Sequence, residues 1–158
     1  IGRREVMEAA QKTFISSTFW TERIGPTAGL KTLEVMEKVK SWDTITNTGN
    51  FISSRWKSLA MKHGLKINVS GLPALITYSL AHENWLACKT FITQEMLKRG
   101  ILAGHSVYVS IAHTQDLLDQ YFNELDDVFY QLSQLNSAKE VIEKLDGPVC
   151  HGGFKRLN

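Results

Sequence analysis

Three neighbouring hydroxyl side chains, Ser16, Ser17 and Thr18, stand between a run of extended type and a stretch with helical periodicity. Residues 14–20 are rich in β-branched and aromatic side chains, and apolar residues recur at helical spacing from 24 to 36. Backbone N–H groups at a helix start favour an anion, so this order of elements can present the hydroxyl groups to a phosphate. The alternative is that the hydroxyl groups only cap the helix and tie down the turn before it.

His105 is the second candidate for chemistry, because it lies in a loop between two predicted strands and an imidazole titrates near neutral pH. It could contact a substrate, or it could be an ordinary exposed loop histidine. Cys150 and His151 place a thiol beside an imidazole, but adjacent side chains of an extended tail point in opposite directions. We therefore interpret that pair as tail structure.

The composition of the chain is that of an ordinary globular protein. Its 158 residues suggest one domain or slightly more, and 43% apolar residues make a buried core feasible. A net charge of +2 is too near neutral to indicate a nucleic-acid surface, and no apolar run approaches a membrane span. The two cysteines form no CxxC pair, so they provide no metal framework and fit a cytoplasmic setting.

The elements that must position these residues follow from periodicity and from helix-capping and turn residues. Expected helix caps are Asp43 or Thr44, then Thr114 and Ser137, and expected helix stops are Gly64 and Gly100. The sequence predicts helices at 3–11, 22–40, 44–63, 82–99, 115–135 and 137–145, and strands at 66–70, 74–80, 101–103 and 107–111.

The order of these elements predicts an α+β fold. The second half reads strand, strand, helix, strand, strand, helix, which implies a small, mainly antiparallel sheet covered by helices. The first half is helical and has little sheet to pack on. In the helix at 115–135, we expect the inward-facing side chains to be those of Leu117, Leu118, Phe122, Leu125 and Phe129.

The hydroxyl-rich stretch resembles the segment after the catalytic lysine in class III aminotransferases, which are fold-type I enzymes dependent on pyridoxal 5'-phosphate (PLP). Glutamate-1-semialdehyde aminomutases have Gly-Thr-Leu-Ser-Gly-Asn-Pro there, followed by Ala-Gly and Thr-Leu. Here 17–23 (STFWTER) leads to Ala28-Gly29 and Thr32-Leu33. The family's threonine, which falls on Thr18, binds the PLP phosphate of the neighbouring subunit. Thr18, with Ser17 beside it, is thus the predicted cofactor-binding position, although the Ser-Gly-Asn-Pro part does not match.

A second segment resembles the C-terminal small domain of the same aminomutases. Residues 96–100 (MLKRG) match a helix end of the type Met-Leu-x-Arg-Gly, and 109–114 (VSIAHT) match a strand end of the type Ser-x-Ala-His. The glutamate that the mutases place in the intervening turn falls on His105, and their glycine falls on Val107. This departure puts mutase activity in doubt and favours a related transaminase.

The resemblance implies a division into three parts. Residues 1–42 would be the end of the PLP-binding large domain, 43–145 the small domain and 146–158 a tail. The lysine that binds PLP would lie upstream of Ile1, so the chain would contain no catalytic residue and would be inactive alone, without bound PLP. The parent enzyme would be a homodimer acting on a small amino or keto substrate. No metal, nucleic acid or membrane is expected.

A different class of function fits the composition equally well. The chain could be a non-catalytic α+β module for binding or interaction. The upstream coding sequence separates the two hypotheses, because a Ser-Lys-x-x-Gly-Asn-Gly-type segment before Ile1 would favour the enzyme and a start codon there would favour the module.

Overall fold

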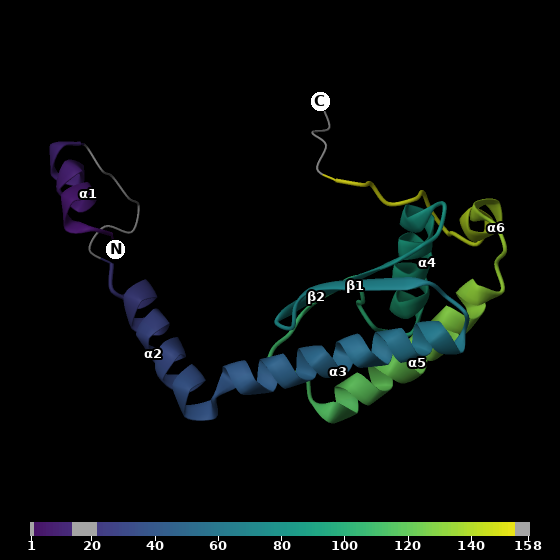
Figure 1. The fold of residues 1–158 in the computed structure, drawn as a ribbon, viewed down its shortest axis with the longest axis horizontal. Helices are drawn as coiled ribbons and strands as arrows, with labels where there is room; N and C mark the ends of the chain where they lie inside the picture. The colour runs from purple at the N-terminus through teal and green to yellow at the C-terminus, as the bar shows by residue number, and fades with distance from the viewer. Residues whose placement is uncertain (1, 14–21, 154–158) are drawn as a thin grey trace. The chain divides into compact units, whose positions relative to one another are not determined.

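The structure is a computed structural model that describes residues 2–13 and 22–153. The chain divides into two compact units, residues 1–39 and 40–158. Figure 1 shows the elements of both units. The assignment of 1–42 to a large domain, 43–145 to a small domain and 146–158 to a tail stays a prediction.

The first unit is helical, as its sequence pattern predicted. It contains α1 (Arg4–Ala9), a short 3₁₀ helix η1 (Ala10–Lys12) and α2 (Ile24–Val39). An ion pair of 3.0 Å between Arg4 and Glu8 links successive turns of α1. Every residue of α2 is exposed among the described residues. The predicted extended run at 14–20 lies outside the part of the chain that the structure describes.

The second unit contains a three-stranded antiparallel sheet, which confirms the predicted α+β class. Its strands are β1 (Ile67–Leu72), β2 (Leu75–Leu80) and β3 (Ser106–Tyr108), in the order β1-β2-β3. Leu75 of β2 lies opposite Leu72 of β1 and Tyr108 of β3, so these three side chains share one face. Ile76, Tyr78 and Leu80 are buried on the other face, as the alternation in the sequence predicted.

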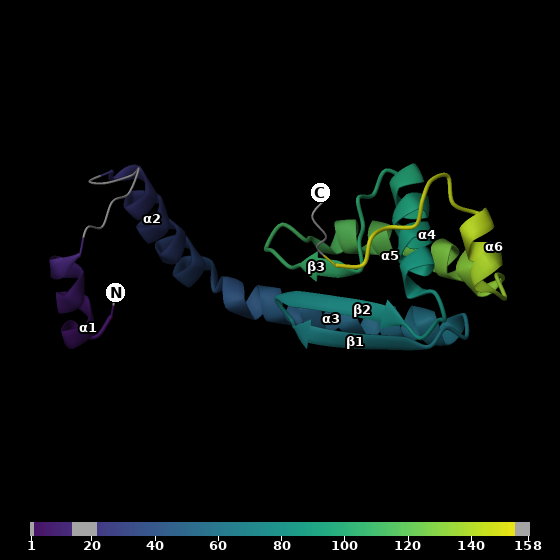
Figure 2. The same ribbon diagram turned by 90° about the horizontal axis from the view of Figure 1, so that it is seen from above.

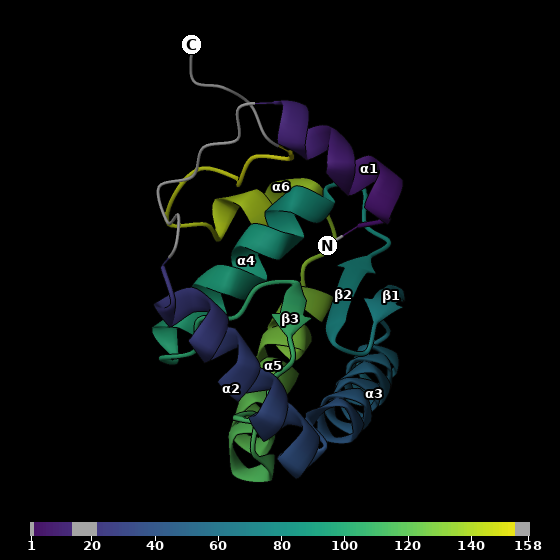
Figure 3. The same cartoon turned by 90° about the vertical axis from the view of Figure 1, so that its left-hand side faces the viewer.

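Four helices accompany the sheet within residues 40–153: α3 (Ser41–Lys62), α4 (Trp85–Lys98), α5 (Gln115–Ser133) and α6 (Ala138–Glu143). α3 packs along the β1–β2 hairpin (Figure 2), and α4 contacts both α5 and α6 (Figure 3). Aromatic rings fill the core between these layers. The ring of Tyr78 lies 4.6 Å from that of Trp56 and 6.1 Å from that of Phe129, measured between centroids.

Helix ends follow the sequence signals in most places. The Ser137 side chain accepts a hydrogen bond from the N–H of Glu140, and Gly64 and Gly100 end their helices at positive φ. Thr114 occupies the cap position of α5, but its side chain makes no cap hydrogen bond. The predicted cap at Asp43 or Thr44 is wrong, because Lys40 turns the chain at a φ of 46° and α3 begins at Ser41.

Two further predictions are wrong. Residues 101–103 form no strand, because the N–H of Ile101 donates to the carbonyl of Met96 at the end of α4, and the N–H of Ala103 donates to Ile101. These amides serve a turn and are not free for a ladder. Leu117 is 54% exposed and does not face inward, whereas Leu118, Phe122, Leu125 and Phe129 are buried.

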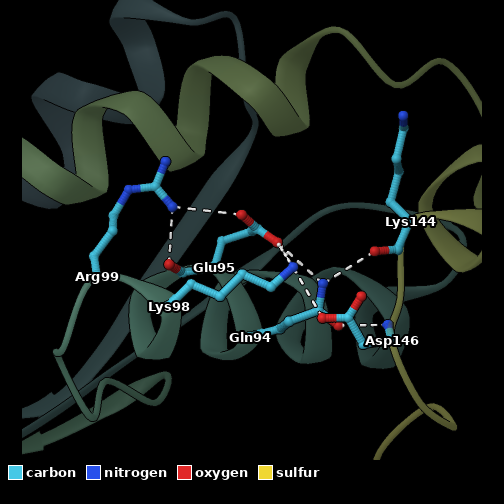
Figure 4. A network of polar contacts seen from close by, with 6 residues as sticks. All are labelled: Gln94, Glu95, Lys98, Arg99, Lys144 and Asp146. Atoms are coloured by element: carbon cyan, nitrogen blue, oxygen red, sulfur yellow. Dashed lines mark hydrogen bonds and ion pairs between the residues drawn. The ribbon is translucent and has the colours of Figure 1, made fainter.

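A network of polar contacts attaches the end of α6 to α4 (Figure 4). The amide of Gln94 donates to the carbonyl of Lys144 at 3.0 Å and accepts from the N–H of Asp146 at 2.7 Å. Lys98 pairs with both Glu95 and Asp146 at 2.9 Å. The side chains of α4 thereby hold the backbone that leads into the tail.

Candidate functional site

The predicted phosphate site cannot be built from the structure, because Ser17 and Thr18 lie outside the described residues. The start of α2 can be described. The carboxylate of Glu22 accepts hydrogen bonds from the N–H groups of Ile24 and Gly25, the latter at 3.1 Å. A side chain therefore caps this helix, and it is Glu22. The roles of Thr18 and Ser17 stay predictions.

His105 lies in the loop between α4 and β3, where the sequence predicted a loop histidine. It is half-buried, and its ring packs edge-to-face against Trp85 at the start of α4, with centroids 6.1 Å apart. Its carbonyl accepts from the N–H of Tyr78 at 2.9 Å and extends the ladder beside β3. The sheet and the indole thus fix this residue, so it is not the freely exposed loop histidine of the alternative hypothesis.

The surroundings of His105 keep its side chain neutral. Burial lowers the pKa of His105 below its usual 6.5, and the positive charge of Lys89 lowers it further. At neutral pH this imidazole can donate or accept a hydrogen bond, but it carries no charge with which to attract a carboxylate. A role for His105 in substrate contact stays a prediction.

A cavity of about 480 Å³ lies beside this loop in the second unit. It is lined by residues 100–104 and 106–108, by His113 and the first turns of α5, and by Ile52 of α3. Ser106, Tyr108, His113, Gln120 and Tyr121 supply its polar groups, while the remaining lining is apolar or glycine. Its volume falls within the range of small-molecule sites. None of its lining residues is a lysine or an arginine.

Two polar side chains of this cavity form hydrogen bonds with neighbouring residues. The indole N–H of Trp56 donates to the Tyr121 hydroxyl at 2.8 Å, and the backbone N–H of Ser110 donates to Nδ1 of His113 at 2.9 Å. Burial raises the pKa of Tyr121, so the hydroxyl stays protonated at neutral pH. Sequence reasoning did not place Tyr121 in a site, although its spacing from Leu118 and Leu125 on α5 indicates a face close to the core.

Two acidic residues of α5 link it to other helices. Asp126 accepts from His63 at 2.6 Å and from Lys62 at 2.5 Å, both at the end of α3. Glu124 pairs with Arg99 of α4 at 3.1 Å. Two carboxylates of α5 are therefore part of the packing between helices and are not merely solvated.

Cys150 and His151 form no nucleophile pair. The N–H of Cys150 donates to the hydroxyl of Thr90 at 2.9 Å, and its thiol approaches the carbonyl of Leu86 at 3.6 Å. His151 is exposed. The interpretation of this pair as tail structure stays a prediction.

Neither a metal cluster nor a membrane-spanning helix occurs within residues 2–13 and 22–153. No group of three or more histidine, cysteine, aspartate or glutamate side chains in this part of the chain could hold a metal ion. No helix within the same residues is long and apolar enough to cross a membrane.

Known proteins with similar sequences are enzymes of amino-group chemistry. No family model matches the chain. It is 22% identical to a 3-aminobutyryl-CoA aminotransferase of Cloacimonas acidaminovorans over 92% of its length, and 21% identical to an aminopentol aminotransferase of Sphingopyxis macrogoltabida over 82%. It is 24% identical to a glutamate-1-semialdehyde 2,1-aminomutase of Hyperthermus butylicus over 84% of its length.

A solved structure has the same fold. The FumI protein of Sphingopyxis sp. MTA144, in its PLP internal aldimine form, superposes on 85% of this chain with a TM-score of 0.76 and 20% sequence identity. The match covers 33% of the FumI chain, and the sequence matches cover 34%, 31% and 35% of the three curated relatives. The chain thus spans about a third of the length of the proteins it resembles.

Proposed function

We propose that this chain, a relative of the class III PLP-dependent aminotransferases and aminomutases, is the C-terminal part of a longer enzyme that transfers an amino group between small molecules. The observation that carries the proposal is the match to a PLP-bound fold over 85% of the chain. Three curated relatives with amino-transfer or aminomutase names support it. PLP, which this family uses, supplies the electron sink for such chemistry when it is bound.

Residues 43–145 would form the small domain that closes over the substrate, and residues 1–42 would be the end of the cofactor domain. Thr18, with Ser17 beside it, would contact the cofactor phosphate across a homodimer interface. The 480 Å³ cavity does not fit the cofactor by itself, since no lysine or arginine lines it to balance the phosphate charge. The cofactor contacts of this chain are therefore assigned to the hydroxyl groups near residue 18.

Transamination is favoured over aminomutation by the residues near the turn at 105. In the resemblance to the aminomutases, their glutamate and glycine fall on His105 and Val107, and burial lowers the pKa of His105, which disfavours its charged form. A neutral imidazole cannot take over the charge of that glutamate. The substrate is proposed to be a small amino or keto compound, and the enzyme is proposed to be cytoplasmic.

The test uses the protein encoded together with the sequence upstream of Ile1. PLP is added to this longer protein and to residues 1–158, both are reduced with borohydride, and the modified lysines are mapped by mass spectrometry. We expect one stoichiometric lysine adduct upstream of Ile1, and amino-donor turnover, in the longer protein only. A stoichiometric adduct on a single lysine within 1–158, or a start codon directly before Ile1, would contradict the proposal.

One observation favours the alternative of a non-catalytic binding module. The 480 Å³ cavity is formed entirely by residues between 52 and 121, so the second unit holds a candidate ligand site without any upstream segment. If the upstream sequence lacks a PLP lysine while the chain binds small molecules, the module is the better description.

A further inference from the structure

Two side chains that line the 480 Å³ cavity can each donate a hydrogen bond. Nδ1 of His113 accepts the Ser110 N–H, so this nitrogen carries no proton and the neutral ring must hold its proton on Nε2. The Tyr121 oxygen accepts from Trp56, so its O–H proton is available to another acceptor. Both side chains line the cavity.

The rest of the lining carries no charged side chain and is mostly apolar, although Ser106, Tyr108 and Gln120 add polar groups. Ile101, Ala103, Val107 and Leu118 contribute apolar surface, and neither a lysine, an arginine, an aspartate nor a glutamate is among the lining residues. An anion would be desolvated there without a countercharge, which is costly. A neutral molecule with an apolar body would lose little solvation free energy on entering the cavity. Its acceptor oxygen could accept hydrogen bonds from the two donors.

Three large side chains that carry apolar surface are exposed at the cavity. Leu102 is 86% exposed, Tyr108 76% and Leu117 54% within the described part of the chain. All three line the cavity. Exposed apolar groups around a cavity of this size are typical of a ligand-binding groove.

We propose that this cavity binds a small neutral molecule with an apolar body and a carbonyl oxygen, which accepts hydrogen bonds from Tyr121 Oη–H and His113 Nε2–H. The site is assigned from the cavity and its donors alone, so it does not depend on the aminotransferase proposal. It lies wholly within the second unit.

The experiment compares three probes on the full 158-residue chain by NMR titration of backbone amide signals. Acetophenone carries the carbonyl, α-methylstyrene has the same shape with CH₂ in place of oxygen, and benzoate adds a negative charge. We expect acetophenone to shift signals from residues 100–108 and 113–121 and to bind about 3- to 10-fold more tightly than α-methylstyrene for each hydrogen bond formed. Benzoate should bind more weakly than acetophenone.

Two variants test the donors. Tyr121→Phe removes the O–H, and His113→Asn keeps an acceptor for the Ser110 N–H but removes the Nε2 donor. Each should reduce the preference for acetophenone over α-methylstyrene about 3- to 10-fold while α-methylstyrene still binds. Tyr130→Phe, which removes a hydroxyl from α5 outside the cavity, is the matched control and should leave the preference unchanged.

Several outcomes would overturn the proposal: equal binding of acetophenone and α-methylstyrene, benzoate binding as tight as acetophenone, no saturable binding, or shifts confined to other residues. Tyr121→Phe also leaves the Trp56 N–H without this acceptor, so its amide spectrum must first show a folded chain. Should that variant fail to fold, His113→Asn decides the question alone.

Discussion

Gly49 in the middle of α3 lies directly against Pro73 in the β1–β2 turn. A Cβ atom at position 49 would stand 2.0 Å from the Pro73 carbonyl oxygen, far inside van der Waals contact. Because the obstacle is backbone, it cannot move aside by a rotamer change. The absence of a side chain at this position allows the hairpin to pack on α3.

We predict that Gly49→Ala destabilises the second unit by about 1–3 kcal/mol, the usual cost of overpacking, despite the better helix propensity of alanine. Urea unfolding of the full chain measures the effect. Gly29→Ala is the control, since it also lies within a helix and a Cβ there meets nothing within 4 Å. An unchanged midpoint for Gly49→Ala would contradict the close packing of α3 against the turn.

Asp126 links α5 to the end of α3 through Lys62 and His63. Burial raises the pKa of Asp126, but the hydrogen bonds from Lys62 and His63 outweigh it and hold the pKa below 3.8. A carboxyl group whose pKa is depressed by folding stabilises the folded state above its unfolded pKa. That contribution is lost as pH falls through the folded pKa.

Asp126→Asn should therefore destabilise the chain by about 1 kcal/mol or less at pH 5.5, with the loss disappearing as pH falls below about 4. Urea unfolding of both proteins across this pH range measures the difference. Asp127→Asn changes the neighbouring exposed carboxylate, which has no ion-pair partner among the described side chains, and should have little effect. A loss for Asp126→Asn that stays constant down to pH 3 would exclude the ion-pair explanation.

Local rules were sufficient for much of this fold. The alternation of Ile76, Tyr78 and Leu80 predicted the buried face of β2, and Ser137 and Gly64 correctly marked helix ends. Each of these signals acts within a few residues. The antiparallel sheet and its helical cover followed from the order of the elements.

The failures have different causes. Ile101 looked like a strand residue, but its N–H is used by the end of α4. Leu117 matched the helical period, yet it lies at the rim of a cavity and is exposed. His105 was identified as a candidate from its loop, but only the structure places Trp85 against it. A contact between side chains twenty residues apart in the sequence cannot be predicted from a local pattern.

His105 should titrate below the usual histidine midpoint of 6.5, because burial and then Lys89 disfavour its charged form. Lys89→Gln should raise the midpoint only in part, since burial against Trp85 remains. NMR detection of the imidazole signals during a pH titration measures this. Lys57→Gln, at an exposed position of α3, provides a control that should not move the midpoint. A midpoint at or above 6.5 in the unmodified chain would show that the ring is freely solvated.

Thr18 offers the most direct test of the proposed cofactor role, in the longer protein that carries the upstream sequence. A hydrogen bond from a hydroxyl to a phosphate is charge-assisted and contributes roughly 1.5–3 kcal/mol. Thr18→Ala should therefore weaken PLP binding by about one to two decades, measured by fluorescence titration, and leave the thermal midpoint nearly unchanged. Ser16→Ala removes a neighbouring hydroxyl that the resemblance does not assign to the cofactor, and it should alter neither quantity. If Thr18 serves only to hold the chain before α2, the loss will appear in thermal stability, with PLP affinity unchanged.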